Sequence, residues 1–134
     1  MKKTRPQCGL LLENGEGRVL LQLRDNNPAI PYPGCWGTFG GQIEEDEEPH
    51  EAIVREIKEE LHYNLVDPEL YQTYQFDGYD IYMFRKHDAD IKVSSLTVCE
   101  GQRAGFFALN EVQQLPCAFN CRMIVENYFN IFSK

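Results

Sequence analysis

Residues 41–63 of this 134-residue chain read GQIEEDEEPHEAIVREIKEELHY, and they hold most of the charge of the protein. Nine of these 23 residues are acidic and two, Arg55 and Lys58, are basic, which gives a net charge of −7 against −8 for the whole chain. The remaining 111 residues carry 12 acids and 11 bases and are nearly neutral. Because the acidity is confined to one stretch, we expect a local cause for it.

The second half of the stretch is predicted to be a helix that begins at Pro49. A proline costs nothing at the first helical position, where its missing N–H would be unpaired anyway. Glu48, just before it, is a poorer cap than Ser or Asp but suits the positive end of the helix dipole. Apolar side chains recur at helical spacing and form one stripe: Ile53, Val54, Ile57 and Leu61. The pattern therefore predicts an amphipathic helix.

An adjoining face of this helix would carry three carboxylates, Glu56, Glu59 and Glu60, because positions i, i+3 and i+4 lie side by side. These carboxylates repel one another, and only Glu51 and Arg55 offer an i,i+4 ion pair of favourable order. A divalent cation would convert the repulsion into binding, since hard cations prefer clustered carboxylate oxygens. A solvated acidic face is the alternative, and for an isolated charge run it is the commoner outcome.

Six glycine and charged positions match the spacing of the Nudix box, G-x5-E-x7-R-E-U-x-E-E-x-G-U, in which U is a bulky aliphatic residue: Gly41, Glu47, Arg55, Glu56, Glu59 and Glu60. The chain therefore resembles the Nudix hydrolase family, in particular its MutT-like members, and the preceding WGTFGG of residues 36–41 is also similar. His62 replaces the late glycine of the box, Tyr63 replaces its final aliphatic residue, and Asp46 stands where many members have glycine. None of these departures removes a carboxylate.

The resemblance implies one α/β domain over residues 1–134, a Nudix-type α/β/α sandwich with a central mixed β-sheet. It also implies Mg²⁺ as the cofactor, with Mn²⁺ as an alternative, and a pyrophosphohydrolase that acts on acid anhydrides. The implied metal ligands are the Gly40 carbonyl and the box carboxylates Glu47, Glu56, Glu59 and Glu60. The loop that contains Glu100 resembles the one in which MutT-like enzymes hold a further metal-associated carboxylate, although a loop glutamate is commonly just solvated.

The chemistry follows from the charges at a diphosphate linkage, whose oxygens repel an incoming hydroxide. Metal ions held by the box carboxylates would neutralise that charge, orient the phosphates and lower the pKa of a bound water. Arg55 is expected to pair with one of the carboxylates and to fix its position. A carboxylate is expected to accept the proton of the water, with Glu56 as first choice and Glu100 as second. The products would be a nucleoside monophosphate and pyrophosphate or another phosphate-bearing leaving group.

Length and composition limit the alternatives. A chain of 134 residues with 43% hydrophobic and 25% charged residues has the size and composition of one globular domain. No apolar run approaches the roughly 18 residues of a membrane span, and the basic residues 1–6 lack the apolar core of a signal peptide. Five irregularly spaced cysteines argue against a disulfide framework and for the cytoplasm. The two that lie closest, Cys117 and Cys121, are expected to be buried thiols rather than zinc ligands.

Outside the predicted helix the pattern indicates strands and two further helices. Strands are expected at residues 7–12, 18–23, 71–76, 79–85 and 104–109, and helices at 110–114 and 119–132. The turn at residues 14–17 would join the first two strands, and Asp77-Gly78 would close a hairpin. Asn110 is expected to cap the first of these helices.

Several residues are candidates for substrate contact. Phe39, Gly40 and Gly41 belong to a segment in which glycine lets the backbone approach a ligand. A loop with three prolines, residues 25–34, leads to Trp36, and either Tyr32 or Trp36 would stack on a base or simply pack in the core. From the resemblance, the best-placed contacts outside this segment are Arg24, Tyr79 and Asn120.

Three classes of function remain open. The favoured one is hydrolysis of a nucleoside triphosphate, standard or oxidised. Hydrolysis of a nucleotide sugar or a dinucleoside polyphosphate is the second, and a Nudix fold that binds a nucleotide without catalysis is the third. The expected partner is a small nucleotide, with no membrane; the acidity of the chain, with a pI near 4.8, argues against duplex nucleic acid. Family members are often dimers, so a homodimer is also an expectation.

Overall fold

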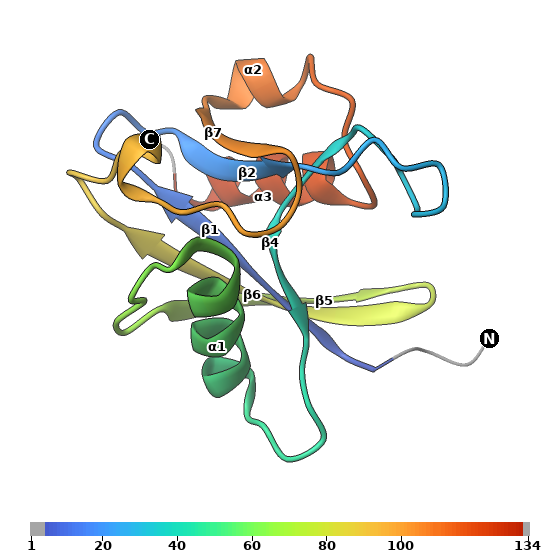
Figure 1. The fold of residues 1–134 in the computed structure, drawn as a ribbon. Helices are drawn as coiled ribbons and strands as arrows, with labels where there is room; N and C mark the ends of the chain where they lie inside the picture. The colour runs from blue at the N-terminus through green and yellow to red at the C-terminus, as the bar shows by residue number, and fades with distance from the viewer. Residues whose placement is uncertain (1–4, 133–134) are drawn as a thin grey trace.

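Strand β1 lies at the centre of the sheet in the computed structural model, which describes residues 5–132 (Figure 1). In chain order the strands are β1 (Gln7–Glu13), β2 (Val19–Leu23), β3 (Trp36–Gly37), β4 (Phe39–Gln42), β5 (Glu69–Phe76), β6 (Tyr79–His87) and β7 (Arg103–Phe107). β1 pairs antiparallel with β2 and β4 and parallel with β6, so the sheet is mixed. The strand order is β3-β2-β1-β6-β5, with β4 beside β1 and β7 beside β2.

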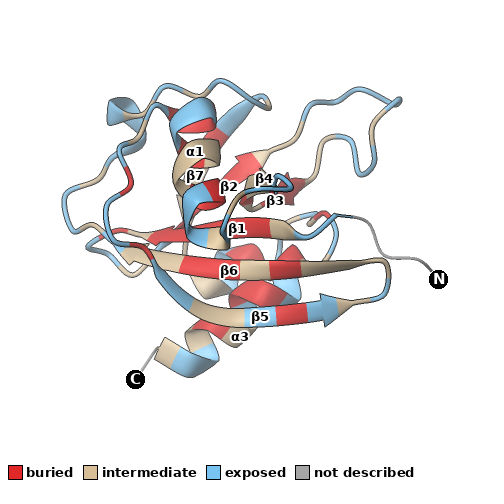
Figure 2. Ribbon diagram, turned by 90° about the horizontal axis from the view of Figure 1, so that it is seen from below, coloured by how far each residue is buried: buried red, intermediate tan, exposed pale blue. Residues whose placement is uncertain are grey.

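Helices cover both faces of this sheet. They are α1 (Pro49–Leu61), α2 (Leu109–Val112) and α3 (Cys121–Phe132), with a single 3₁₀ turn η1 (Val93–Ser95) between β6 and β7. α1 lies on one face and α3 on the other (Figures 1 and 2). The predicted α/β/α sandwich with a central mixed β-sheet is confirmed.

The two cores follow from the alternation of side chains along β1. Leu10 and Leu12 belong to the core on the α1 side, and Leu11 belongs to the core on the α3 side. β6 divides in the same way, with Phe84 on the α1 side and Met83 on the other. Figure 2 shows the buried residues concentrated in these two strands and on the helix surfaces that face them. A strand that is apolar on both faces was predicted for β6, and it does lie between β1 and β5.

Helix α1 begins at Pro49, as the sequence predicts. The Glu48 backbone N–H donates to Glu51 Oε1 at 2.9 Å, which completes a capping box at this end. Glu51 therefore caps the helix instead of pairing with Arg55. The helix ends where His62 adopts the left-handed conformation, with φ of 53°, and donates its N–H to the Lys58 carbonyl at 3.0 Å.

Several predicted boundaries were wrong by one to three residues. The last helix begins at Cys121 and not at residue 119, because Phe119 has a φ of 51° and cannot continue a right-handed helix. α2 begins at Leu109 after Ala108, so Asn110 is not its cap. Of the two thiols expected to be buried, Cys121 is buried and Cys117 is only half-buried. All five cysteines are free.

The five predicted strands are present and in the predicted order, but the structure contains seven, because the short strands β3 and β4 were not predicted, and not every strand end agrees. β5 begins at Glu69 and β6 continues to His87, both beyond the expected limits, while β7 covers Arg103–Phe107. Among residues 5–132, no helix has both the length and the apolar character that a bilayer span requires. The expectation that no signal peptide precedes the domain depends largely on residues 1–4, which lie outside the described residues.

Candidate functional site

The glycine pair of β4 brings the backbone into contact with the acidic face of α1. Gly40 has a φ of 149°, and a Cβ there would lie 2.0 Å from the Cys8 carbonyl oxygen. A Cβ on Gly41 would lie 2.5 Å from the carboxyl carbon of Glu56. The Gly40 N–H donates to Glu60 Oε1 at 3.0 Å. Only glycine fits at position 40, because a Cβ there would occupy the space of the β1 backbone; at position 41 a Cβ would displace the Glu56 carboxylate.

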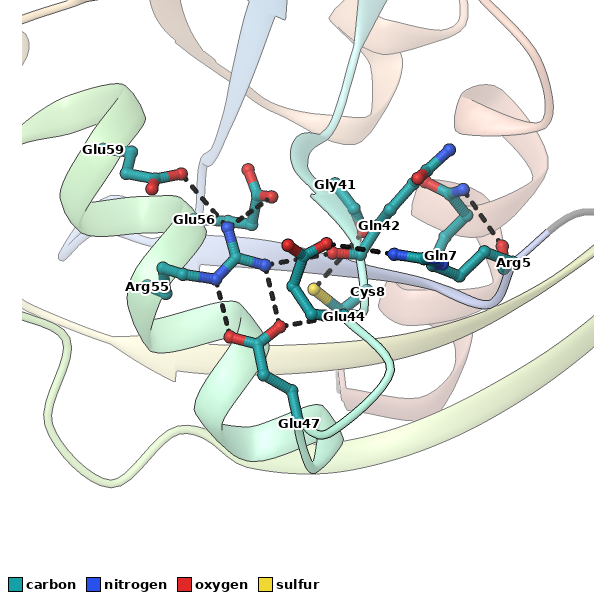
Figure 3. Close-up of polar contacts among 10 residues, drawn as sticks. All are labelled: Arg5, Gln7, Cys8, Gly41, Gln42, Glu44, Glu47, Arg55, Glu56 and Glu59. Atoms are coloured by element: carbon teal, nitrogen blue, oxygen red, sulfur yellow. Dashed lines mark hydrogen bonds and ion pairs between the residues drawn. The ribbon is translucent and has the colours of Figure 1, made fainter.

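The Arg55 guanidinium joins three carboxylates from α1 and the loop before it (Figure 3). Its Nε and Nη2 donate to the two oxygens of Glu47 at 2.6 and 2.8 Å. Its Nη1 donates to Glu56 Oε2 at 3.0 Å and to Glu59 Oε1 at 3.2 Å, and its Nη2 also reaches the Gln42 carbonyl at 3.1 Å. Arg55 therefore neutralises carboxylates that would otherwise repel one another, as the sequence analysis expected of it.

These surroundings shift the pKa values of the carboxyls in different directions. Hydrogen bonds from Arg55, and a weaker one from the Glu44 backbone N–H, lower the pKa of Glu47 to about 2. The same ion pairing raises the pKa of the Arg55 guanidinium. Burial raises the pKa of Glu56 above its ordinary value, although Arg55 opposes the shift. The Glu56 carboxylate is therefore more basic than that of Glu47.

Glu60 lies deeper, with a relative exposure of 6%, and no arginine reaches it in the described structure. Burial is the main cause that raises its pKa to about 10, and a hydrogen bond shared with the Glu100 carboxyl adds to the effect. Glu100 comes from the loop before β7, some 40 residues along the chain from Glu60. The structure thus brings Glu100 to the box carboxylates, where the sequence analysis expected it.

The chemistry of this donor set suits a divalent cation. Five carboxyls lie in this region (Glu47, Glu56, Glu59, Glu60 and Glu100), and within residues 5–132 Arg55 is the basic side chain that hydrogen-bonds to three of them. Carboxyl oxygens are the ligands that Mg²⁺ and Mn²⁺ prefer. Within the described residues no three His, Cys, Asp or Glu side chains converge closely enough to form a ready metal cluster. Arg55 accounts for this in part, because it already holds oxygens of three of the carboxylates.

A cavity of about 270 Å³ opens beside the carboxylates. Gly40, Gly41 and Glu100 line it, and so do Arg24, Tyr79 and Asn120, which the sequence analysis named as substrate contacts. Asn120 Nδ2 donates to the Tyr79 hydroxyl at 2.8 Å, so two of these residues already hold each other in place. Arg24 donates from Nε and Nη2 to the Pro31 carbonyl at 3.1 and 2.8 Å, which fastens the proline-rich loop to the cavity wall.

The structure shows where two of the candidate contact residues, Trp36 and Phe39, lie. The Trp36 side chain has a relative exposure of 7% and packs edge-on against Phe107 at 4.8 Å between ring centroids, so it packs in the core and does not stack on a base. The Phe39 ring is fully buried on the α1 side of the sheet and can contribute only its backbone. Both side chains are buried because β3 and β4 are strands of the sheet, and each side chain packs into one of the two cores.

Phe119 also lines this cavity, and the sequence analysis did not name it as a candidate contact. It has a relative exposure of 51%, its ring lies 4.7 Å from that of Tyr32, and the Arg24 guanidinium lies 5.3 Å from its centroid. Phe119 and Tyr32 both have left-handed backbones, with φ of 51°. The available signal was an aromatic residue directly before Asn120, but the helical pattern placed it inside the last helix.

Comparison with known proteins identifies relatives of this arrangement. A family model described as NUDIX domain matches residues 3–119. An RNA pyrophosphohydrolase of Pseudomonas putida is 31% identical over 108 residues, which cover 81% of this chain and 62% of that protein. An RNA pyrophosphohydrolase of Gluconacetobacter diazotrophicus is 38% identical over 60 residues, 42% of this chain and 36% of that one. The chain thus spans between about a third and two thirds of the length of these relatives.

Solved structures share the fold over nearly the whole chain. The MutT NUDIX hydrolase from Burkholderia pseudomallei has a TM-score of 0.76 and 27% identity, and the match covers 93% of this chain and 98% of that one. The NUDIX domain of Shewanella oneidensis NrtR, solved in complex with ADP ribose, has a TM-score of 0.80 at 20% identity, with 99% and 91% covered. The second likeness concerns the fold alone.

Proposed function

The chain belongs to the NUDIX family, and we propose that it is a Mg²⁺-dependent pyrophosphohydrolase whose substrate is a free nucleoside triphosphate, standard or oxidised. The products are a nucleoside monophosphate and pyrophosphate. One observation carries this proposal: a single cavity is lined by both the glycine pair with Glu100 and the group formed by Arg24, Tyr79, Phe119 and Asn120. Phosphates and a planar base therefore find suitable partners within one site.

The roles of the residues follow from their surroundings. Glu47, Glu56, Glu59, Glu60 and the Gly40 carbonyl would hold the divalent cations that NUDIX proteins generally use. When bound, such ions neutralise phosphate charge and lower the pKa of a water. Glu56 takes the proton of the attacking water, because burial raises the pKa of this carboxyl above its ordinary value. Arg55 holds Glu47 and Glu56 in position. Asn120 and Tyr79 present their polar groups to the edge of the base.

A second candidate substrate is the triphosphate at the 5′ end of an RNA. The names of the relatives at 31% and 38% identity favour it. The acidity of this chain, with a net charge of −8, opposes it, because polynucleotide binding depends on basic surface. Nucleotide sugars and dinucleoside polyphosphates remain alternatives within the same chemistry, and a binding domain without turnover is the alternative outside it.

The test is a substrate panel measured with and without Mg²⁺, with Mn²⁺ as a substitute. It includes standard and oxidised nucleoside triphosphates, nucleotide sugars, ADP-ribose, dinucleoside polyphosphates and a 5′-triphosphate RNA. We expect the highest kcat/KM for a free triphosphate, and Glu59→Gln is expected to abolish turnover with the fold intact. Preference for the RNA would replace the proposed substrate. Tight nucleotide binding without any turnover would identify a binding domain.

The assignment of the base to the aromatic end of the cavity has its own test. Phe119→Ala removes the exposed ring and is expected to raise KM about tenfold, the scale of one base-stacking contact, with kcat within twofold of the wild type. Met123→Ala, an exposed side chain of α3 that does not line the cavity, is the matched control and should leave KM unchanged. An unchanged KM in Phe119→Ala would remove the base from this end of the cavity.

A further inference from the structure

His62, at the position where the NUDIX box has glycine, makes a contact that glycine could not make. Its Nε2 lies 3.3 Å from the Cys99 Sγ, and both side chains are exposed. The His62 backbone is left-handed, with φ of 53°, a conformation that costs a residue with a side chain more than it costs glycine. This chain therefore carries a less favourable residue at the end of α1 together with a side-chain contact to the loop that contains Glu100.

The segment from Thr97 to Glu100 is attached to the end of α1 by its backbone as well. The Cys99 N–H donates to the Glu60 carbonyl at 2.8 Å, and the Thr97 N–H donates to the Leu61 carbonyl at 3.1 Å. The next residue, Glu100, shares a hydrogen bond with the Glu60 carboxyl. The backbone of Glu60 therefore holds Cys99 while its side chain meets Glu100.

The other side of the same loop is attached to β2. Gln22 is buried and donates from Nε2 to the Glu100 carbonyl at 3.0 Å, and the Gln102 N–H donates to the Leu23 carbonyl at 2.8 Å. These contacts hold the backbone at and after Glu100. The segment before Glu100 is held by its contacts with the end of α1. On that side, within residues 5–132, the polar side-chain contact from α1's end to the segment is the one between His62 and Cys99.

We propose that His62 is a positioning residue: its imidazole, through Cys99, holds the Glu100 segment against the end of α1 and so sets the Glu100 carboxyl beside that of Glu60. The effect on turnover rests on the proposed function, whereas the effect on the loop does not. His62 touches no reacting group and acts through Cys99. Histidine at the glycine position of the box is less favourable for the left-handed backbone at the end of α1, but its side chain fixes the position of the Glu100 carboxyl.

The test uses His62→Gly, which restores the family residue and removes the imidazole. Hydrogen exchange at the Cys99 amide is expected to become about fivefold faster, the factor that one ordinary hydrogen bond contributes. Mn²⁺ binding to the protein alone, followed by paramagnetic relaxation, is expected to weaken by a similar factor, as is kcat, while KM stays within twofold. The thermal midpoint should stay the same or rise, because glycine suits the left-handed position.

Cys99 supplies the partner controls. Cys99→Ala should reproduce the effect on kcat and on Mn²⁺ binding, Cys99→Ser should retain most of the wild-type behaviour because its hydroxyl also bonds an imidazole, and the double variant His62→Gly/Cys99→Ala should be no worse than either single one. Asp67→Gly is the matched backbone control, since Asp67 is also exposed and left-handed, with φ of 50°. It should leave exchange at the Cys99 amide unchanged.

Three results would overturn the proposal: wild-type amide exchange and Mn²⁺ affinity in His62→Gly, additive effects of the two single substitutions, or a loss of kcat that is matched by a fall in the thermal midpoint. A wild-type protein without turnover on any nucleotide would refute the proposed function. The exchange and Mn²⁺ measurements would still decide the role of His62 in that case.

Discussion

Glu47 and Glu60 lie at opposite ends of the same acidic stretch and differ in almost every physical respect. Glu47 is held by two hydrogen bonds from Arg55, and its pKa is lowered to about 2. Glu60 is buried, meets a second carboxyl, and has its pKa raised to about 10. The sequence presents both as glutamates of one motif, but in the fold Glu47 pairs with the Arg55 guanidinium, whereas Glu60 has no basic partner among the described residues.

The difference shows which of the two carboxyls already has a basic partner within the protein. The Arg55–Glu47 pair is already satisfied in the protein alone, and it connects α1 to the loop before it. At Glu60, burial disfavours the ionised carboxylate, so this side chain favours a proton or an external cation. Buried charge without a partner is unfavourable for stability, and such positions concentrate at functional sites. We therefore expect substitutions at the two ends to have opposite effects on stability.

Among substitutions that compare Glu47 with Glu60, the largest effect is expected from Glu60→Gln. The amide can accept the Gly40 N–H and donate to Glu100, so the fold remains, but turnover should fall about 1000-fold, the upper scale for loss of one strong electrostatic contribution. Because the folded pKa of Glu60 exceeds its ordinary value of 4.5, the stability of the wild type falls as the pH rises from about 4.5 towards 10. The variant lacks this fall and should be about 1 kcal/mol more stable at pH 8 in urea unfolding without metal.

Glu45→Gln is the control for that measurement, because Glu45 is an exposed acid of the same stretch outside the site. It should leave both turnover and the pH dependence of stability as in the wild type. A Glu60→Gln variant that is less stable than the wild type at pH 8 would contradict the view that Glu60 is an unpartnered buried acid.

A smaller effect is expected from Arg55→Lys at the other end. An ammonium group cannot bond Glu47 through two parallel hydrogen bonds and reach Glu56, Glu59 and the Gln42 carbonyl as well. We expect turnover to fall about 10- to 100-fold, the range typical of residues that hold metal ligands in place, and the urea midpoint to fall with it. Loss of turnover without loss of stability would make the two ends of the motif alike.

The smallest effect is expected from Glu47→Gln, on the stability of the protein at acidic pH. The folded pKa of Glu47 lies below its ordinary value of 4.5, so its contribution is present above that pH and is lost as the pH falls from about 4.5 to about 2. Glu47→Gln should flatten the decline of the urea midpoint between pH 5 and pH 3. An unchanged slope would mean that other carboxylates, and not the Arg55–Glu47 pair, determine acid unfolding.

Much of the fold could be predicted because its signals are local. The helical spacing of Ile53, Ile57 and Leu61, the Asp77-Gly78 turn and the two-sided apolar pattern of β6 all predicted the element that the structure contains. The misplaced element ends have a common cause as well. Phe119 fits a helical pattern of side chains, but its backbone is left-handed and its ring lies against Tyr32 and Arg24, which are about 90 residues away in the chain.

The motif of residues 41–63 was enough to identify the family, to predict α1 and to locate the acids of α1 and of the loop before it. The direction in which each carboxyl pKa shifts depends on the tertiary structure, because it is set by burial and by whether Arg55 or Glu100 lies beside the group. The tertiary structure also decided that Trp36 packs in the core while Phe119 faces the cavity. Local spacing sets which side chains share a helix face, whereas burial and partners from distant segments set their charge and exposure.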